Sequence, residues 1–142
     1  MRPSALVPAS SPEETTMPRP VHFEIHASEP ERAITFYTTV FDWTFERSTE
    51  ASYWLITTGE GPGIDGGMAQ RQGPPPDPDA SLNAFPLTVE VEDLDLLSRE
   101  IEQAGGSVIT TKSAIADVGW IVYCRDPEGN IFGMLETDPS AR

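Results

Sequence analysis

Apolar and polar residues follow two different spacings along this chain, and the spacings change in the same order twice. Between residues 21 and 27 apolar side chains occupy every second position, which predicts a β-strand with one buried face. Residues 30–41 carry apolar side chains at helical spacing, after Ser28 and Glu29, either of which can cap a helix. Three further strands are then predicted, at residues 43–48, 53–58 and 64–71.

The same order returns after a proline-rich segment at residues 73–79, which cannot form a helix or a central strand. A strand is predicted first, then a helix that ends at Gly105 and Gly106, then three strands: residues 84–91, 92–105, 107–112, 119–125 and 130–136. The chain is therefore expected to be an α+β protein with two βαβββ modules. The predicted boundaries are a disordered tail at 1–19, a first module at 20–72, a linker at 73–82 and a second module at 83–138.

Charge and length exclude several classes of partner. The 142 residues include 9 Lys and Arg against 23 Asp and Glu, so the formal net charge is −14 and no nucleic-acid partner is expected. No apolar run approaches the roughly 20 residues that a membrane-spanning helix needs. Residues 1–19 lack the apolar centre of a signal peptide, and Met1 or Met17 can be the start. With a single cysteine, Cys124, a cytoplasmic protein is expected.

The two opening strands can be overlaid residue by residue. His22 falls on Pro86, Glu24 on Thr88 and His26 on Glu90. The alternate positions are apolar in both strands and are expected to pack on the helices: Phe23, Ile25, Phe85, Leu87, Val89 and Val91. The polar positions are then expected to line the opposite, concave face of the sheet as ligand-binding residues: His22, Glu24, His26, Thr88 and Glu90.

Four segments resemble the vicinal oxygen chelate superfamily, which includes glyoxalase I, bleomycin-resistance proteins and extradiol dioxygenases. They are AITFYTTVFDW at 33–43, GGM at 66–68, QAGG at 103–106 and DPEGNIFGMLE at 126–136. The resemblance covers residues 20–137. It implies two paired modules that form a cup around a small organic ligand, often in a homodimer.

The resemblance also implies positions for metal ligands on the first and last strand of each module: His22, Gly67, Pro86 and Gly133. Only His22 carries a donor atom, whereas a catalytic zinc usually needs three protein ligands. Alternate strand residues lie about 6.6 Å apart, so Glu24 could share an ion with His22 or with His26. Asp65 or Glu90 could then add a third ligand. No metal is expected, with a divalent ion as the alternative.

Three functions remain open from the sequence. The first is a ligand-binding, glyoxalase-like protein, or a metal-independent lyase or isomerase in which Glu24 and His22 exchange protons with the substrate. The second is a metal-dependent enzyme of glyoxalase or dioxygenase type that uses the same two residues. The third is a protein that sequesters a drug without chemistry, as bleomycin-resistance proteins do.

Several other residues have structural interpretations. Trp54 and Trp120 lie on predicted strands, where they can stack on a ligand or pack in the core. Phe36, Tyr37 and Cys124 are expected to be core residues. Residues 126–129, Asp-Pro-Glu-Gly, are expected to form a tight hairpin turn and not a phosphate or metal loop.

Overall fold

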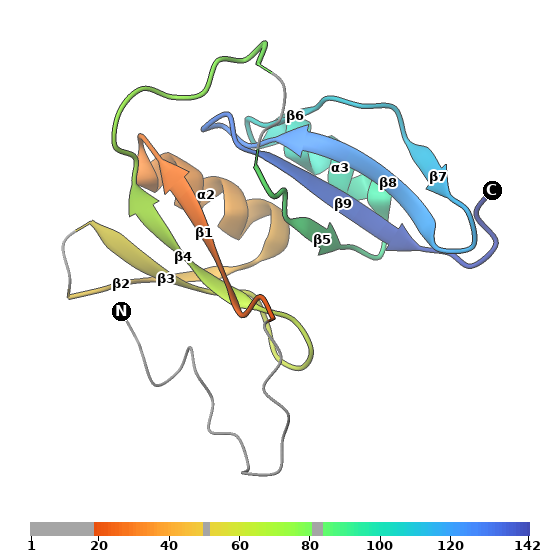
Figure 1. Cartoon of the computed structure of the whole chain (residues 1–142), viewed down its shortest axis with the longest axis horizontal. Helices are drawn as coiled ribbons and strands as arrows, with labels where there is room; N and C mark the ends of the chain where they lie inside the picture. The colour runs from red at the N-terminus through yellow and green to blue at the C-terminus, as the bar shows by residue number, and fades with distance from the viewer. Residues whose placement is uncertain (1–18, 50–51, 81–83) are drawn as a thin grey trace.

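Two β-sheets, each covered by one helix, lie side by side in the computed structural model (Figure 1). The structure describes residues 19–49, 52–80 and 84–142. The predicted tail falls outside these residues except for Arg19, and so do residues 81–83 at the predicted end of the linker.

In the described residues of the first module the chain forms β1 (His22–Ala27), α2 (Pro30–Phe41), β2 (Thr44–Arg47), β3 (Tyr53–Thr57) and β4 (Asp65–Gln70). Its sheet has the order β1-β4-β3-β2, in which β1 runs parallel to β4 and the other neighbours are antiparallel. Parallel neighbours need a crossover connection, and here α2 carries the chain from β1 at one edge of the sheet to β2 at the other edge. The predicted βαβββ order is confirmed for this half.

The second module repeats this order: β5 (Thr88–Glu90), α3 (Leu94–Gln103), β6 (Ser107–Val108), β7 (Ser113–Ile115), β8 (Gly119–Arg125) and β9 (Ile131–Thr137). Its strand order is β5-β9-β8, with β5 parallel to β9, and both β6 and β7 pair with β8. The strand predicted at 107–112 is thus two shorter strands. The N–H of Tyr123, on β8, donates to the hydroxyl of Thr110 and not to a backbone carbonyl, so the ladder along β8 is interrupted between β6 and β7.

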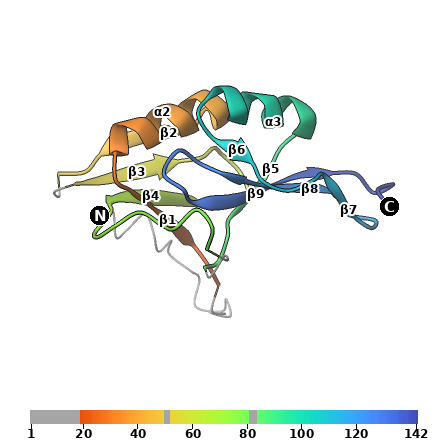
Figure 2. The ribbon, with the colours of Figure 1, turned by 90° about the horizontal axis from the view of Figure 1, so that it is seen from above.

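Both helices cover the same face of the two sheets, as Figure 2 shows, and the opposite face stays open. The apolar core lies between the helices and the sheets. Its largest fully buried side chains come from both modules: Phe36, Ile56, Met68, Leu94, Ile101, Met134 and Cys124. The core positions predicted for Phe36, Tyr37, Ile25 and Cys124 are confirmed.

The opening strand of the second module is shorter than predicted. Only Thr88–Glu90 pair with β9, although Leu87 still accepts a hydrogen bond from the N–H of Gly133. Pro86 has no N–H to contribute to a ladder. Phe85 is fully exposed, so its predicted packing against a helix is wrong.

The N-terminus of α2 is capped from the other module. The Glu128 carboxylate, in the turn between β8 and β9, accepts the backbone N–H groups of Ser28 and of Glu29, the latter at 2.9 Å. It also accepts from Arg32 at 2.8 Å, and Arg71 lies 3.5 Å away. Glu29 occupies the N-cap position but makes no side-chain cap bond, so the predicted capping by Ser28 or Glu29 is wrong. A carboxylate at this end is favoured by the helix dipole.

The turn that carries Glu128 is itself held by Asp126. The Asp126 carboxylate accepts the N–H of Glu128 at 2.8 Å and that of Asn130 at 2.9 Å, which confirms the predicted turn. It also accepts the hydroxyl of Tyr37, on α2, at 2.6 Å. Burial raises the pKa of Asp126, although these hydrogen bonds partly lower it again. Burial and the neighbouring Asp126 carboxylate both raise the pKa of Tyr37.

Aromatic packing completes the contact between the modules. The ring of Phe132, on β9, lies 5.8–6.3 Å from the ring centres of three residues of α2: Phe36, Tyr37 and Phe41. Such ring pairs add stabilisation beyond the area that they bury. The modules therefore share an aromatic core and a cap, and no ladder joins β1 to β5.

Removing the charge of Glu128 should loosen this contact. We expect Glu128→Gln to lower the free energy of unfolding by about 2–4 kcal/mol, because an amide cannot accept both N–H groups as a carboxylate does and leaves Arg32 and Arg71 without the negative charge of Glu128. Glu29→Gln is the matched control. Glu29 also pairs with Arg32 but is exposed, so its loss should cost less than about 0.5 kcal/mol in the same urea titration.

The pH dependence gives the same comparison a second measurement. Burial alone would raise the pKa of Glu128, but the two N–H groups and Arg32 outweigh it and lower that pKa below its ordinary value. The carboxylate then stabilises the fold fully above the ordinary pKa of glutamate, about 4.3, and loses this effect as the pH falls through the folded-state pKa. The difference in unfolding free energy between wild type and Glu128→Gln should therefore become smaller as the pH falls below about 4. A difference that does not change with pH would contradict the capping role.

Candidate functional site

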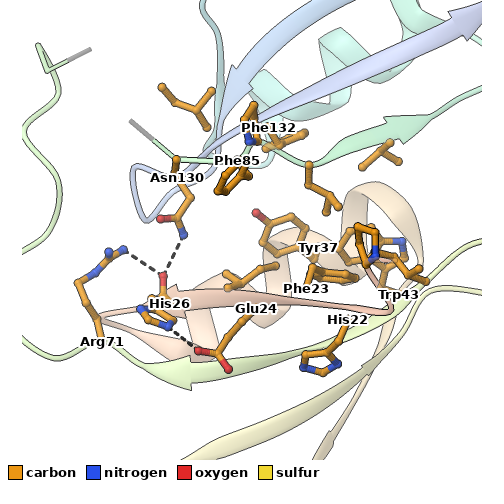
Figure 3. A pocket seen from close by; sticks show the side chains of 18 residues that line it. His22, Phe23, Glu24, His26, Tyr37, Trp43, Arg71, Phe85, Asn130 and Phe132 are labelled. Carbon is orange, nitrogen blue, oxygen red and sulfur yellow. Dashed lines mark hydrogen bonds and ion pairs between the residues drawn. The ribbon is translucent and has the colours of Figure 1, made fainter. Parts of the chain in front are cut away.

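The polar row of β1 lies on the open face, as the alternation predicts. Ile25 and Ala27 are buried beneath the helices, while His22, Glu24 and His26 point to the other side (Figure 3). Of the two pairs considered for Glu24, the structure forms the one with His26 and not the one with His22. Nε2 of His26 lies 2.7 Å from the Glu24 carboxylate, with both side chains about half exposed. Nε2 of His22 lies 3.1 Å from the hydroxyl of Tyr53, on β3.

The predicted residues of the second module lie across from this row. Thr88 is opposite Gly133 in the register of β5 and β9, and the Glu90 carboxylate accepts the hydroxyl of Thr137 at 2.8 Å. These side chains line one cavity, of about 630 Å³, whereas His22, Glu24 and His26 line another, of about 610 Å³. The five predicted residues thus lie along one groove but do not form a single cluster.

The two tryptophans lie away from this row. Trp54 is opposite Met68 in the ladder, is buried in the core, and carries the guanidinium of Arg47 over its ring at 4.9 Å. Trp120 donates to Asp138 at 3.1 Å and has the ammonium group of Lys112 5.2 Å from its ring centre. The structure gives both a packing environment, and neither lines the two large cavities.

The groove itself runs between the edge strands β1 and β5. The two cavities share an apolar set of lining residues, so they form one continuous groove: Phe23, Trp43, Ile64, Leu87 and Val89. Trp43 stacks on Tyr37, with ring centres 5.2 Å apart and planes 4° apart, and Phe23 packs 5.7 Å from Trp43. An aromatic floor with a few polar groups at the rim is typical of a small-molecule site of this volume.

One end of the groove is closed by polar contacts between the modules. The backbone carbonyl of His26 accepts Nη2 of Arg71 at 3.0 Å and Nδ2 of Asn130 at 2.9 Å (Figure 3). Arg71 also donates to the backbone carbonyl of Glu128 at 2.9 Å. The turn that caps α2 therefore also fixes the end of β1 that carries the Glu24–His26 pair.

The residues at the implied ligand positions do not fit a divalent metal. Within residues 19–49, 52–80 and 84–142, no group of three His, Cys, Asp or Glu side chains is placed to hold one. Asp65, a candidate third ligand, instead accepts the N–H and hydroxyl of Thr58 at 2.9 and 3.2 Å. The hydroxyl of Tyr53 lies at Nε2 of His22, and Nδ1 of His22 is buried with no hydrogen-bond partner in the described part of the chain.

The sequence did not identify Tyr53 or the aromatic floor as parts of the site. Tyr53 is on β3, the second strand after β1 along the chain, and only the sheet order brings it to His22. The one local signal was Gly67 within a strand, since a glycine there often marks the close approach of another group. Phe23 and Trp43 have the pattern of core residues, and their edges are exposed to the groove because β1 is an edge strand.

Comparisons with known proteins agree with this fold. Residues 19–134 match the family model of the Glyoxalase/Bleomycin resistance protein/Dioxygenase superfamily. No curated protein matches the sequence. No helix in the described part of the chain is long and apolar enough to cross a membrane.

Three solved structures illustrate the likeness, which at these identities concerns the fold alone. A glyoxalase/bleomycin resistance protein/dioxygenase family enzyme from Burkholderia phytofirmans PsJN is 18% identical with a TM-score of 0.65, over 82% of this chain and 97% of that one. The fosfomycin resistance protein FosX from Listeria monocytogenes is 10% identical with a TM-score of 0.69, over 87% and 94%. A variant of the Listeria protein, complexed with Mn(II) and 1S,2S-dihydroxypropylphosphonic acid, is 10% identical with a TM-score of 0.67, over 87% and 93%.

The assignment of the two faces of β1 can be tested by neighbouring substitutions. Ile25→Ala should cost about 2–5 kcal/mol of unfolding free energy, the range for truncating a buried aliphatic side chain. Glu24→Ala should cost less than about 1 kcal/mol, because its ion pair with His26 is half exposed. Chemical denaturation of both variants measures the difference. If Glu24→Ala proves as costly as Ile25→Ala, the assignment of faces is wrong.

Proposed function

We propose that this chain, which belongs to the Glyoxalase/Bleomycin resistance protein/Dioxygenase superfamily, binds a small organic ligand in the groove between its two modules without a metal ion. The observation that carries the proposal is the continuous aromatic floor formed by Phe23, Trp43 and Tyr37 between two strand edges. The floor suits an apolar or aromatic part of the ligand. The rim residues Glu24, His22 and His26 suit a polar part that lies on the open face.

The rim also limits the chemistry that the site can perform. The Glu24–His26 pair, at 2.7 Å, can accept and return a proton at the mouth of the groove. His22 is held against Tyr53 instead, so Glu24 and His22 do not act on one proton together. If the protein is a lyase or isomerase, we therefore place its base at Glu24, with His26 as the partner. Thr88 and Glu90 contact the ligand from the second module.

A second candidate function is sequestration without chemistry. The size and apolar floor of the groove suit a ligand equally well in an enzyme and in a protein that only sequesters it. Turnover of a bound compound without added metal identifies an enzyme, and tight binding with no turnover identifies a sequestering protein. A metal-dependent enzyme would instead lose its activity on chelation.

We also propose that two copies associate. Phe85 is fully exposed at the mouth of the groove, which it lines, beside the edge of β5, and β1 on the other side of the groove is likewise an edge strand. Exposed edges and aromatic residues are commonly covered by a second copy in twofold assemblies. Sedimentation velocity at micromolar concentration should then show a dimer that Phe85→Ser weakens; a monomer in wild type would contradict the proposal.

The ligand site is tested by blocking its floor. Leu87→Arg places a charged side chain in the part of the groove that both cavities share, so we expect it to abolish binding of small aromatic compounds in ligand-observed NMR. Leu96→Arg is the matched control, since Leu96 lies on α3 and is 41% exposed. It should leave binding and melting temperature unchanged. Compounds that bind equally to wild type and to folded Leu87→Arg would place the site elsewhere.

A further inference from the structure

Gly67 lies directly beneath a tyrosine. On β4 it is opposite Glu24 of β1 and Leu55 of β3, and Tyr53 is two residues from Leu55 along β3, on the same face. A Cβ atom added at Gly67 would overlap the hydroxyl oxygen and Cζ of Tyr53. Only glycine therefore allows the phenol to lie where it does, and any side chain at position 67 would have to displace it.

The same phenol reaches His22. Its hydroxyl lies 3.1 Å from Nε2 of that ring, while Nδ1 is buried with no hydrogen-bond partner among the described residues. The hydroxyl oxygen of Tyr53 therefore both contacts His22 and fills the position that a Cβ atom at residue 67 would take. Nε2 is engaged and Nδ1 is enclosed, so the ring presents neither nitrogen to an ion.

The second module repeats half of this arrangement. Tyr123 on β8 is opposite Gly133 on β9, where a Cβ would lie 3.3 Å from the tyrosine ring and 3.4 Å from Oγ1 of Thr88. Pro86 takes the position that corresponds to His22, so this tyrosine has no imidazole beside it. The asymmetry places the polar centre of the open face in the first module.

We propose that Tyr53 occupies the position of the missing ligand at residue 67, so that the Tyr53–His22 pair, and not a divalent cation, is the polar centre that this face presents to a ligand. With Nε2 of His22 engaged and Nδ1 enclosed, the hydroxyl of Tyr53, which can both donate and accept, is the atom of the pair that can hydrogen-bond a hydroxyl or carbonyl group of a ligand. The inference deepens the proposed function, on which its ligand contact rests. The structural half, that Tyr53 excludes both a side chain at 67 and an ion at His22, is testable without any ligand.

The first experiment is a double-mutant cycle between the two positions. Gly67→Ala should displace the phenol, lower the melting temperature by more than about 5 °C and change the ¹⁵N signals of the His22 ring. In a Tyr53→Ala background, Gly67→Ala should leave the melting temperature almost unchanged. Gly133→Ala is the matched control, because the tyrosine ring there needs to shift by only a few tenths of an ångström.

The cycle decides the proposal even if Gly67→Ala does not fold. In that case the double variant must fold as well as Tyr53→Ala alone. Tyr53 does not occupy this position if Gly67→Ala lowers the melting temperature as much in the Tyr53→Ala background as in wild type. The same conclusion follows if the double variant is unfolded while Tyr53→Ala is folded.

The second experiment titrates the full chain with Zn²⁺ while the His22 ring is followed by long-range ¹H–¹⁵N NMR. The His22 signals should not move, and any shift should be confined to His26 and disappear in His26→Ala. Stoichiometric Zn²⁺ binding that shifts the His22 signals and is lost in His22→Ala would overturn the proposal. Neither experiment depends on the groove, so a failure here is distinct from a failure of ligand binding there.

Discussion

The carboxylate of Glu128 is the central contact between the two modules. It accepts the N–H groups of Ser28 and Glu29, the two residues just before α2, across the module boundary and lies beside Arg32 and Arg71. No ladder joins the sheets, so this cap, the Tyr37–Asp126 hydrogen bond and the Phe132 ring set the distance between β1 and β5. That distance is the width of the groove. A buried carboxylate is costly unless it is fully hydrogen-bonded, which here requires α2 and the β8–β9 turn to stay together.

Local pattern was enough to predict most of the fold. The alternation around Ile25 and the helical spacing around Phe36 each place apolar side chains on one face, and the structure buries both residues. The errors occur where a distant group changes the outcome. Glu128 has the residue type of a turn and gives no sign that it caps a helix about 100 residues earlier. Phe85 fits the alternation, but Pro86 follows it and the strand begins only at Thr88, so Phe85 lies outside the strand and is exposed.

The candidate site was only partly accessible from the sequence, for the same reason. Its polar row on β1 is local and is placed as predicted, with Glu24 and His26 in contact. The partners of that row are not local, since Tyr53 reaches His22 only through the order β1-β4-β3. Gly67 links the two, because its missing side chain is what leaves room for the phenol. A strand pattern records which face a residue takes but not which side chain lies beside it.

The central proposal is that this protein holds an organic ligand without a metal ion, because its groove has an aromatic floor and the described residues of its open face include no metal-binding set. Elemental analysis combined with native mass spectrometry, on protein purified without a metal-affinity tag, tests it most directly. The predicted result is no stoichiometric divalent metal, together with folded protein that retains an added organic compound from a screen. One metal ion per chain that disappears in His22→Ala would contradict the claim.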